Sequence, residues 1–235
     1  MRLVIELEPF SEIQYDYLNK HAIQGLFYYL LKDTSFDNLH SSNKFKYFTF
    51  SDIFPISDFK PGFKKTLLFS SPSNELVNAL YDSILRYKTV KIKNLNFNIQ
   101  NVKKIKLNLT YRFISGSPIV LYKDNKSNEY FSFEKHNNLN FFLERLKENA
   151  IKKYNTYTGE SMILDEPLFD KLIFKKEVVV KDFKIGKEFI IIGSVWKLLE
   201  KFHIPDYLYN FYEFLMDCGL GEKNSLGYGF INPVK

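Results

Sequence analysis

The sequence predicts an α+β protein built from two ferredoxin-like domains in tandem, each a βαββαβ unit with an antiparallel sheet. Two observations lead to this prediction. Segments of alternating apolar residues, typical of strands, are interspersed with segments whose apolar residues recur at helical spacing. The same order of segments can be followed twice along the chain, which places the two domains at residues 1–107 and 108–235.

The first of these domains has a complete set of elements. Leu3, Ile5 and Leu7 alternate with polar residues, which indicates a half-buried strand. Ser71 and Pro72 are typical of a helix N-cap and a first helical residue. We therefore expect strands at 1–8, 45–53, 65–70 and 89–99, a helix at about 16–33, and a second helix that begins after Ser71 and carries Leu76, Leu80, Ile84 and Tyr87 on one face.

The second domain repeats this order less regularly. A helix at about 138–153 is indicated by an apolar stripe that includes Leu139, Phe142 and Leu146. Trp196 is expected to lie in the core. The remaining elements are expected as strands around Gly116-Ser117 within 109–122, strands at 129–133, 171–181 and 187–195 with 181–187 as a connection, a helix at 206–216 and a last strand at 228–234.

Composition restricts the class of protein. Hydrophobic residues make up 45% of the chain, which is enough for a core, and no apolar run approaches the ~20 residues of a membrane span. The first residues lack the pattern of a cleavable signal peptide. A single cysteine excludes an intrachain disulfide and a multi-cysteine metal site. We therefore expect a cytoplasmic protein without membrane contact.

Charge and aromatic content both favour a nucleic-acid partner. The net charge is +6 and aromatic residues make up 17% of the chain. Lysines bind phosphates and aromatic rings stack on bases, so the combination suggests RNA or single strands. Most of the rings must nevertheless belong to the core.

A glycine-rich segment at 218–229, CGLGEKNSLGYG, is the most distinctive stretch. Its spacing matches neither a Walker loop nor a dinucleotide fingerprint, and successive N–H groups in such a loop can form a nest for anions. We expect it to bind a nucleic-acid backbone; the alternative is a long turn before the last strand. The expected RNA-binding residues are Gly219, Gly221, Lys223, Asn224, Ser225, Gly227 and Gly229, with further basic runs at Lys103, Lys104 and Lys106 and at Lys152–Lys153.

The motif GLGEKNSLGYGF resembles the C-terminal glycine-rich motif of the CRISPR-associated repeat-processing endoribonucleases, the Cas-six family of the RAMP superfamily. The resemblance extends to the other end of the chain. There, Gly25-Leu26-Phe27-Tyr28 is followed by His40 in a polar loop and then by Lys46-Tyr47-Phe48-Thr49-Phe50-Ser51. The resemblance implies the same tandem domains and a catalytic set of Tyr28, His40 and Lys46.

The chemistry of these residue types is consistent with that implication. The histidines lack metal-ligand spacing and no acidic cluster is present to hold paired magnesium ions, so we expect no metal and no cofactor. RNA cleavage without metal needs a group that transfers protons near neutral pH, and histidine has an ordinary pKa of about 6.5. His40 is the first candidate and His21 the reserve, while His136 is expected at the surface and His203 at the end of a segment. Lys44 is an alternative to Lys46.

The resemblance implies a metal-independent endoribonuclease that cuts CRISPR precursor RNA within its repeats and leaves 2′,3′-cyclic phosphate and 5′-OH ends. His40 would be the general acid or the general base, Lys46 would stabilise charge, and Tyr28 would donate a proton or orient a group. The expected partners are CRISPR repeat RNA and other CRISPR-associated proteins, with the chain a monomer or a homodimer. The alternatives are a non-catalytic RNA-binding RAMP-type subunit and, with less support, a domain that binds phosphoproteins or small anions.

Overall fold

The computed structural model describes residues 1–124, 127–184 and 187–234, and side chains outside 182–188. Contacts divide the chain into two compact units. The first contains Met1–Leu107 together with Ser225–Gly227, and the second contains Asn108–Asn224 and Tyr228–Lys235. A short piece of the glycine-rich segment is thus part of the first unit.

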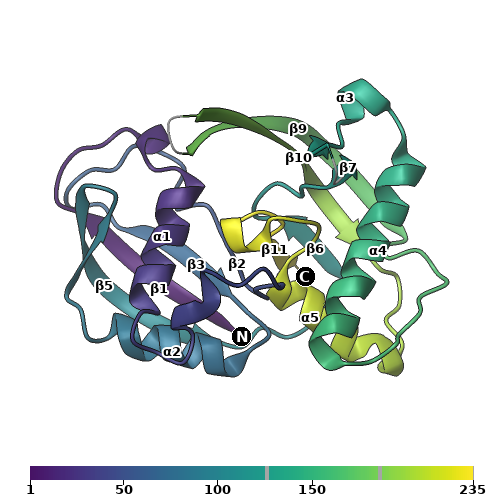
Figure 1. The fold of residues 1–235 in the computed structure, drawn as a ribbon, viewed down its shortest axis with the longest axis horizontal. Helices are drawn as coiled ribbons and strands as arrows, with labels where there is room; N and C mark the ends of the chain where they lie inside the picture. The colour runs from purple at the N-terminus through teal and green to yellow at the C-terminus, as the bar shows by residue number, and fades with distance from the viewer. Residues whose placement is uncertain (125–126, 185–186, 235) are drawn as a thin grey trace. The chain divides into compact units, whose positions relative to one another are not determined.

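The first unit has a five-stranded antiparallel sheet in the order β2-β3-β1-β5-β4. The first four positions reproduce the strand order of a ferredoxin-like fold, and β4 adds an edge strand. Both helices contact the sheet (Figure 1). Leu3, Ile5 and Leu7 of β1 are buried in the core. The elements are β1 (Arg2–Pro9), α1 (Lys20–Leu30), β2 (Thr49–Phe50), β3 (Lys65–Ser70), α2 (Asn74–Ile84), β4 (Thr89–Ile92) and β5 (Leu95–Ile105), with 3-10 turns at Tyr15–Tyr17 and Asp37–Leu39.

The expected strand at 45–53 is wrong in its length, since only Thr49–Phe50 is a strand. Tyr47 has a φ of 48°, a left-handed conformation that interrupts an extended backbone. The Ser71 hydroxyl donates to the Tyr47 carbonyl at 2.6 Å and so holds this turn in place. The β-propensity of the aromatic residues before Thr49 therefore predicted a strand that begins too early.

Three other element boundaries in this unit differ from those expected from the sequence. The cap of α2 is Ser73 rather than Ser71, because the Ser73 side chain accepts from the N–H of Leu76. The single strand expected at 89–99 is a hairpin of β4 and β5, turned at Lys93 with a φ of 53°. The first helix is shorter than expected and begins after the N-cap Asn19.

The second unit has a four-stranded antiparallel sheet in the order β11-β6-β10-β9, the same ferredoxin-like order. The predicted fold class, two ferredoxin-like units with antiparallel sheets, is confirmed. Trp196 is buried as predicted. The elements are β6 (Arg112–Ser115), β7 (Tyr122–Asp124), β8 (Glu129–Tyr130), α3 (Phe133–His136), α4 (Leu139–Thr158), β9 (Lys171–Lys184), β10 (Lys187–Glu200), α5 (Tyr209–Cys218) and β11 (Ile231–Val234), with 3-10 turns at Asp206–Leu208 and Asn224–Leu226.

Several elements of this unit differ in length from the expectation. Strands β9 and β10 are longer, and the connection expected at 181–187 falls partly outside the described residues. Helix α4 continues to Thr158, where Gly159 adopts a φ of 79° and ends it. The short ribbon of β7 and β8 is a separate two-stranded sheet.

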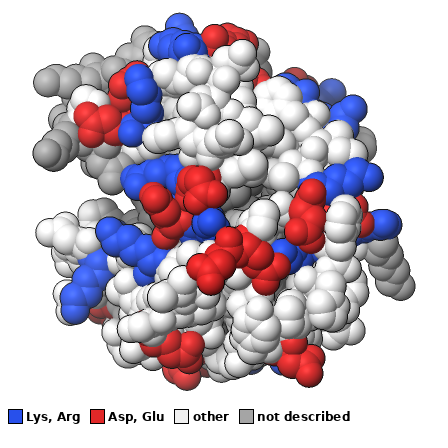
Figure 2. Space-filling view, turned by 90° about the vertical axis from the view of Figure 1, so that its right-hand side faces the viewer, with Lys and Arg blue, Asp and Glu red and all other residues white. Residues whose placement is uncertain are grey.

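Charge on the surface of α4 is mixed. Figure 2 shows lysine and arginine interspersed with aspartate and glutamate on the side that carries this helix in Figure 1. On α4 itself, Arg145 pairs with Glu148 and Lys147 pairs with Glu144. Among the described helices, none has both the length and the apolar character needed to cross a membrane.

Candidate active site

Tyr28 is held at the side of α1 by the packing of its neighbours. Ile23, Leu26, Phe27 and Leu30 of this helix are buried in the core. Tyr28 lies on the flank of that apolar stripe and is half-buried. Its ring keeps an edge-on contact with the buried Phe48 at 6.2 Å between centroids.

Lys46 and His40 are linked through the loop that joins α1 to β2. His40 directly follows the 3-10 turn Asp37–Leu39 and is exposed. The Lys46 amine donates to the His40 carbonyl at 2.8 Å and closes the intervening loop. Tyr47, between Lys46 and Phe48, has a left-handed backbone conformation. Because the chain turns there, the Lys46 side chain stays with the loop while the Phe48 ring is buried in the core.

The three side chains implied by the family resemblance converge. The Lys46 amine donates to the Tyr28 hydroxyl at 3.1 Å and lies 5.0 Å from the centre of the Tyr28 ring. The Tyr28 and His40 rings meet at 4.8 Å with an interplanar angle of 87°. These contacts favour Lys46 over Lys44, which is exposed and whose backbone N–H donates to Ser42 Oγ.

Burial changes the ionisation of this cluster. Desolvation raises the pKa of Tyr28 to about 12, partly offset by a hydrogen bond from the Ser225 side chain. Desolvation also lowers the pKa of Lys46. No carboxylate forms an ion pair with Lys46 in the part of the chain that the structure describes. The phenol thus stays protonated at neutral pH and can donate, beside a cation that no carboxylate neutralises.

The piece of the glycine-rich segment that belongs to the first unit lies against α1. Gln24 Nε2 donates to the Ser225 carbonyl at 2.7 Å, one helical turn before Tyr28. The Lys20 amine donates to the Gly227 carbonyl at 2.9 Å and to Asp52 at 2.6 Å. Sequence reasoning missed Lys20 and Gln24. Lys20 and Gln24 lie two turns and one turn before Tyr28, near its face of the helix. The sequence around them contains no signal for hydrogen-bond acceptors about 200 residues further along the chain.

The rest of the glycine-rich segment is folded around a buried lysine of the second unit. The Lys153 amine donates to the carbonyls of Gly219 and Gly221 at 2.7 and 3.0 Å and to the Asn224 side chain at 2.8 Å. Lys153 is only 2% exposed. The expectation that it belongs to a surface basic run with Lys152 is therefore wrong, because the Lys153 amine donates its hydrogen bonds to acceptors inside the second unit.

Few backbone N–H groups of the expected anion nest are available to bind an anion. The N–H groups of Gly219, Leu220, Glu222 and Gly229 all donate to protein carbonyls. The Asn224 amide donates to the carbonyls of Leu220 and Tyr228. These glycines permit close packing: a β-carbon at Gly229 would lie 1.8 Å from the Leu220 carbonyl oxygen. RNA binding by this segment stays a prediction, and its half-exposed members are Glu222, Lys223, Asn224 and Ser225.

Two other candidate histidines, His136 and His203, belong to the second unit. His136, expected at the surface, is half-buried: its ring accepts from the Ser132 N–H and contacts the exposed Glu129. His203 is exposed in the segment after β10. In the described residues, no three His, Cys, Asp or Glu side chains are grouped as metal ligands.

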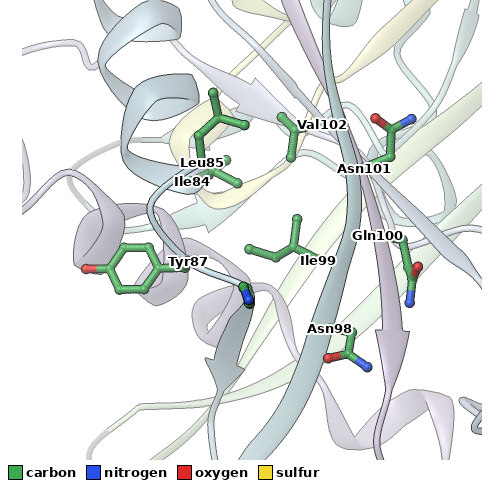
Figure 3. Close-up of a pocket in the computed structure, with 9 residues that line it drawn as sticks. Ile84, Leu85, Tyr87, Asn98, Ile99, Gln100, Asn101 and Val102 are labelled. Carbon is green, nitrogen blue, oxygen red and sulfur yellow. The ribbon is translucent and has the colours of Figure 1, made fainter.

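A groove of about 490 Å³ on the first unit does not involve the cluster. Figure 3 shows apolar side chains of α2 and β5 facing one another there, with amide side chains along β5. Its lining is Ile84, Leu85, Tyr87, Lys88, Asn98, Ile99, Gln100, Asn101 and Val102. None of these side chains is suited to proton transfer near neutral pH.

The fold and the cluster define a protein of two ferredoxin-like units with a tyrosine, a histidine and a lysine in mutual contact. Comparison with known proteins then specifies the family. Residues 100–233 match the sequence model of "CRISPR associated protein Cas6, C-terminal". The chain is 46% identical, over the whole of both chains, to a CRISPR-associated endoribonuclease Cas6 2 of Methanocaldococcus jannaschii. The chain therefore belongs to the Cas6 family of CRISPR-associated endoribonucleases.

Solved structures show the same fold. A Cas6-related protein from Pyrococcus furiosus superposes with a TM-score of 0.75 at 20% identity, with 100% of this chain and 98% of the other covered. A RAMP protein described as binding different RNA substrates superposes with a TM-score of 0.73 at 18% identity, over the full length of both chains.

Proposed function

We propose that the Tyr28–His40–Lys46 cluster is the active site with which this Cas6 endoribonuclease cuts CRISPR precursor RNA within its repeats during crRNA maturation. The observation that carries the proposal is the convergence of these three side chains from a helix, a loop and the segment before a strand. Their functional groups are those required by acid–base cleavage of RNA.

In the proposed reaction, the 2′-oxygen attacks the adjacent phosphorus and the bond from phosphorus to the 5′-oxygen breaks. The 2′-OH loses a proton and the 5′-oxygen gains one, so the products are a 2′,3′-cyclic phosphate and a 5′-OH. His40 transfers one of these protons, as general acid or general base. Lys46 stabilises the negative charge that develops on the phosphorane. Tyr28, protonated because burial raises its pKa to about 12, donates a hydrogen bond or a proton.

No step of this scheme requires a metal ion, since protons and charge are both handled by side chains. The proposed RNA partner is a CRISPR repeat, with contacts from Lys223, Asn224 and Ser225 of the glycine-rich segment. Association with other CRISPR-associated proteins, and a monomeric or homodimeric state, stay predictions.

Single-turnover cleavage of end-labelled repeat RNA in EDTA tests the proposal. Wild-type protein is expected to cut the RNA and leave a 5′ fragment whose terminal 2′,3′-cyclic phosphate resists phosphatase until acid opens the ring to a phosphate monoester. His40→Ala is expected to slow the reaction by about 10²- to 10⁴-fold, the typical contribution of one acid–base group.

His203→Ala is the matched control, because His203 is an exposed histidine outside the cluster. It is expected to cleave at the wild-type rate. A strict requirement for Mg²⁺, or an unimpaired His40→Ala protein, would contradict the proposed site. Salt-sensitive RNA binding with no cleavage under any condition would instead favour the non-catalytic alternative.

A further inference from the structure

A stacked pair of tyrosines stands next to the glycine-rich segment in the second unit. Tyr122 of β7 and Tyr130 of β8 are cross-strand partners, and their rings stack at 4.9 Å with an interplanar angle of 18°. The Lys223 amine lies 5.5 Å from the centre of one ring and 5.7 Å from the other. All three side chains are half-exposed rather than buried.

The carboxylates next to this group have partners of their own, since Glu129 of β8 is paired with Lys123 at 3.3 Å. Glu222 is paired with Arg145 at 3.2 Å, and Lys153 and Lys223 also act on its charge. The Glu222 carboxylate thus has Arg145 as its ion-pair partner. Over the described residues, Lys223 itself makes no ion pair, and its position is defined by the two rings. An anion that approaches Lys223 therefore meets a cation that is already held in place.

The location of the pair is unusual for rings that only support a core. The core of the second unit contains its own aromatic cluster, in which Phe142 and the Trp196 ring are buried against each other. Tyr122 and Tyr130 belong instead to the separate two-stranded ribbon. A half-exposed aromatic surface beside a lysine that makes no ion pair in the described residues is the combination by which proteins bind unpaired nucleotides.

We propose that Tyr122, Tyr130 and Lys223 form a binding site for an unpaired nucleotide of RNA, with the base stacked on the tyrosine pair and its phosphate on the Lys223 amine. This proposal rests on the proposed function and specifies where single-stranded RNA is held. It also assigns a role to the β7–β8 ribbon, which is an addition to the ferredoxin-like strands.

The test uses two fluorescent oligonucleotides of twelve residues, one of oligouridylate and one with an abasic ribose-phosphate backbone of equal length. Binding is measured by anisotropy in the full-length His40→Ala protein, so that no cleavage occurs. Oligouridylate is expected to bind more tightly than the abasic strand. Tyr130→Leu and Tyr122→Leu are expected to weaken its binding by about 5- to 30-fold, as for the loss of one base stack. Tyr122→Phe and Tyr130→Phe, which keep the rings, are expected to retain it.

Lys223→Gln is expected to weaken both oligonucleotides and to reduce the slope of log affinity against log salt by about 1. Matched controls are Tyr207→Leu, an exposed tyrosine of the same unit, and Lys135→Gln on α3; neither is expected to change binding. Cross-linking of wild-type protein to 4-thiouridine RNA gives a readout independent of folding, with modified peptides expected to contain Tyr122 or Tyr130.

Equal affinity for the uridylate and abasic strands in the His40→Ala protein, or leucine variants that bind like their phenylalanine counterparts, would overturn the proposal. Cross-links confined to other peptides would do the same. Since cleavage of repeat RNA is measured separately, an active enzyme with unaffected tyrosine variants would refute this site alone, whereas an inactive wild type would refute the proposed function.

Discussion

The hydroxyl of Tyr28 has two hydrogen-bonding partners, Lys46 and Ser225, that can be removed separately. Tyr28→Phe removes a proton donor from the cluster, and we expect cleavage to slow by about 10²-fold. Because burial raises the pKa of Tyr28 to about 12, the phenol stays protonated in the working range. The loss is therefore expected to be the same factor from about pH 6 to about pH 9, as measured by single-turnover rates. Tyr29→Phe, an exposed tyrosine on the same helix, is the control.

Ser225→Ala is expected to have a smaller effect on single-turnover rates at saturating protein, where its proposed RNA contact no longer limits the reaction and only its hydrogen bond to Tyr28 is tested. Loss of one hydrogen bond of about 1 kcal/mol corresponds to roughly fivefold in rate. In the Tyr28→Phe background the serine has no hydroxyl to orient, so its replacement is expected to add nothing further. Additive effects in the double variant would show that Ser225 acts independently of Tyr28.

At the scale of elements, the glycine-rich segment depends on a lysine from α4. Lys153→Met leaves two carbonyls and an amide oxygen without their donor, and we expect a loss of about 3 kcal/mol in the free energy of unfolding. Urea unfolding measures it. Lys152→Met, at the exposed neighbouring position, is expected to stay within about 0.5 kcal/mol of wild type. Equal stability of the two variants would contradict the structural role of Lys153.

The elements themselves show which kinds of sequence signal are reliable. Alternating apolar residues located β1 correctly, and the 3.6-residue stripe located α2 and α4. The strand at 45–53 was overextended because a single left-handed residue, Tyr47, outweighs the propensity of its aromatic neighbours. The N-cap of α2 is Ser73 rather than Ser71 for a related reason, since the Ser71 hydroxyl donates to the Tyr47 carbonyl.

At the scale of the whole molecule, Gly227 joins the end of the chain to the core of the first unit. An added β-carbon would lie 2.3 Å from the Phe50 ring, and the φ of 80° disfavours any other residue. Gly227→Ala is thus expected to lower the free energy of unfolding by about 2 to 4 kcal/mol, measured by thermal unfolding. Gly25→Ala is the matched control: nothing lies within 4 Å of its added β-carbon, so a gain of about 0.5 to 1 kcal/mol is expected for this helical site. A neutral Gly227→Ala would refute the packing of this segment.

The sequence by itself determined the fold class, because side-chain periodicity reports burial directly, and the resemblance at both ends of the chain pointed to Tyr28, His40 and Lys46. Only the tertiary structure decided that Lys46 rather than Lys44 reaches Tyr28, that Lys153 is buried, and that Ser225 and Gly227 lie against α1. The physical reason is that these contacts are hydrogen bonds and close approaches between residues far apart in the chain. Such contacts leave no periodic pattern in the sequence around either partner.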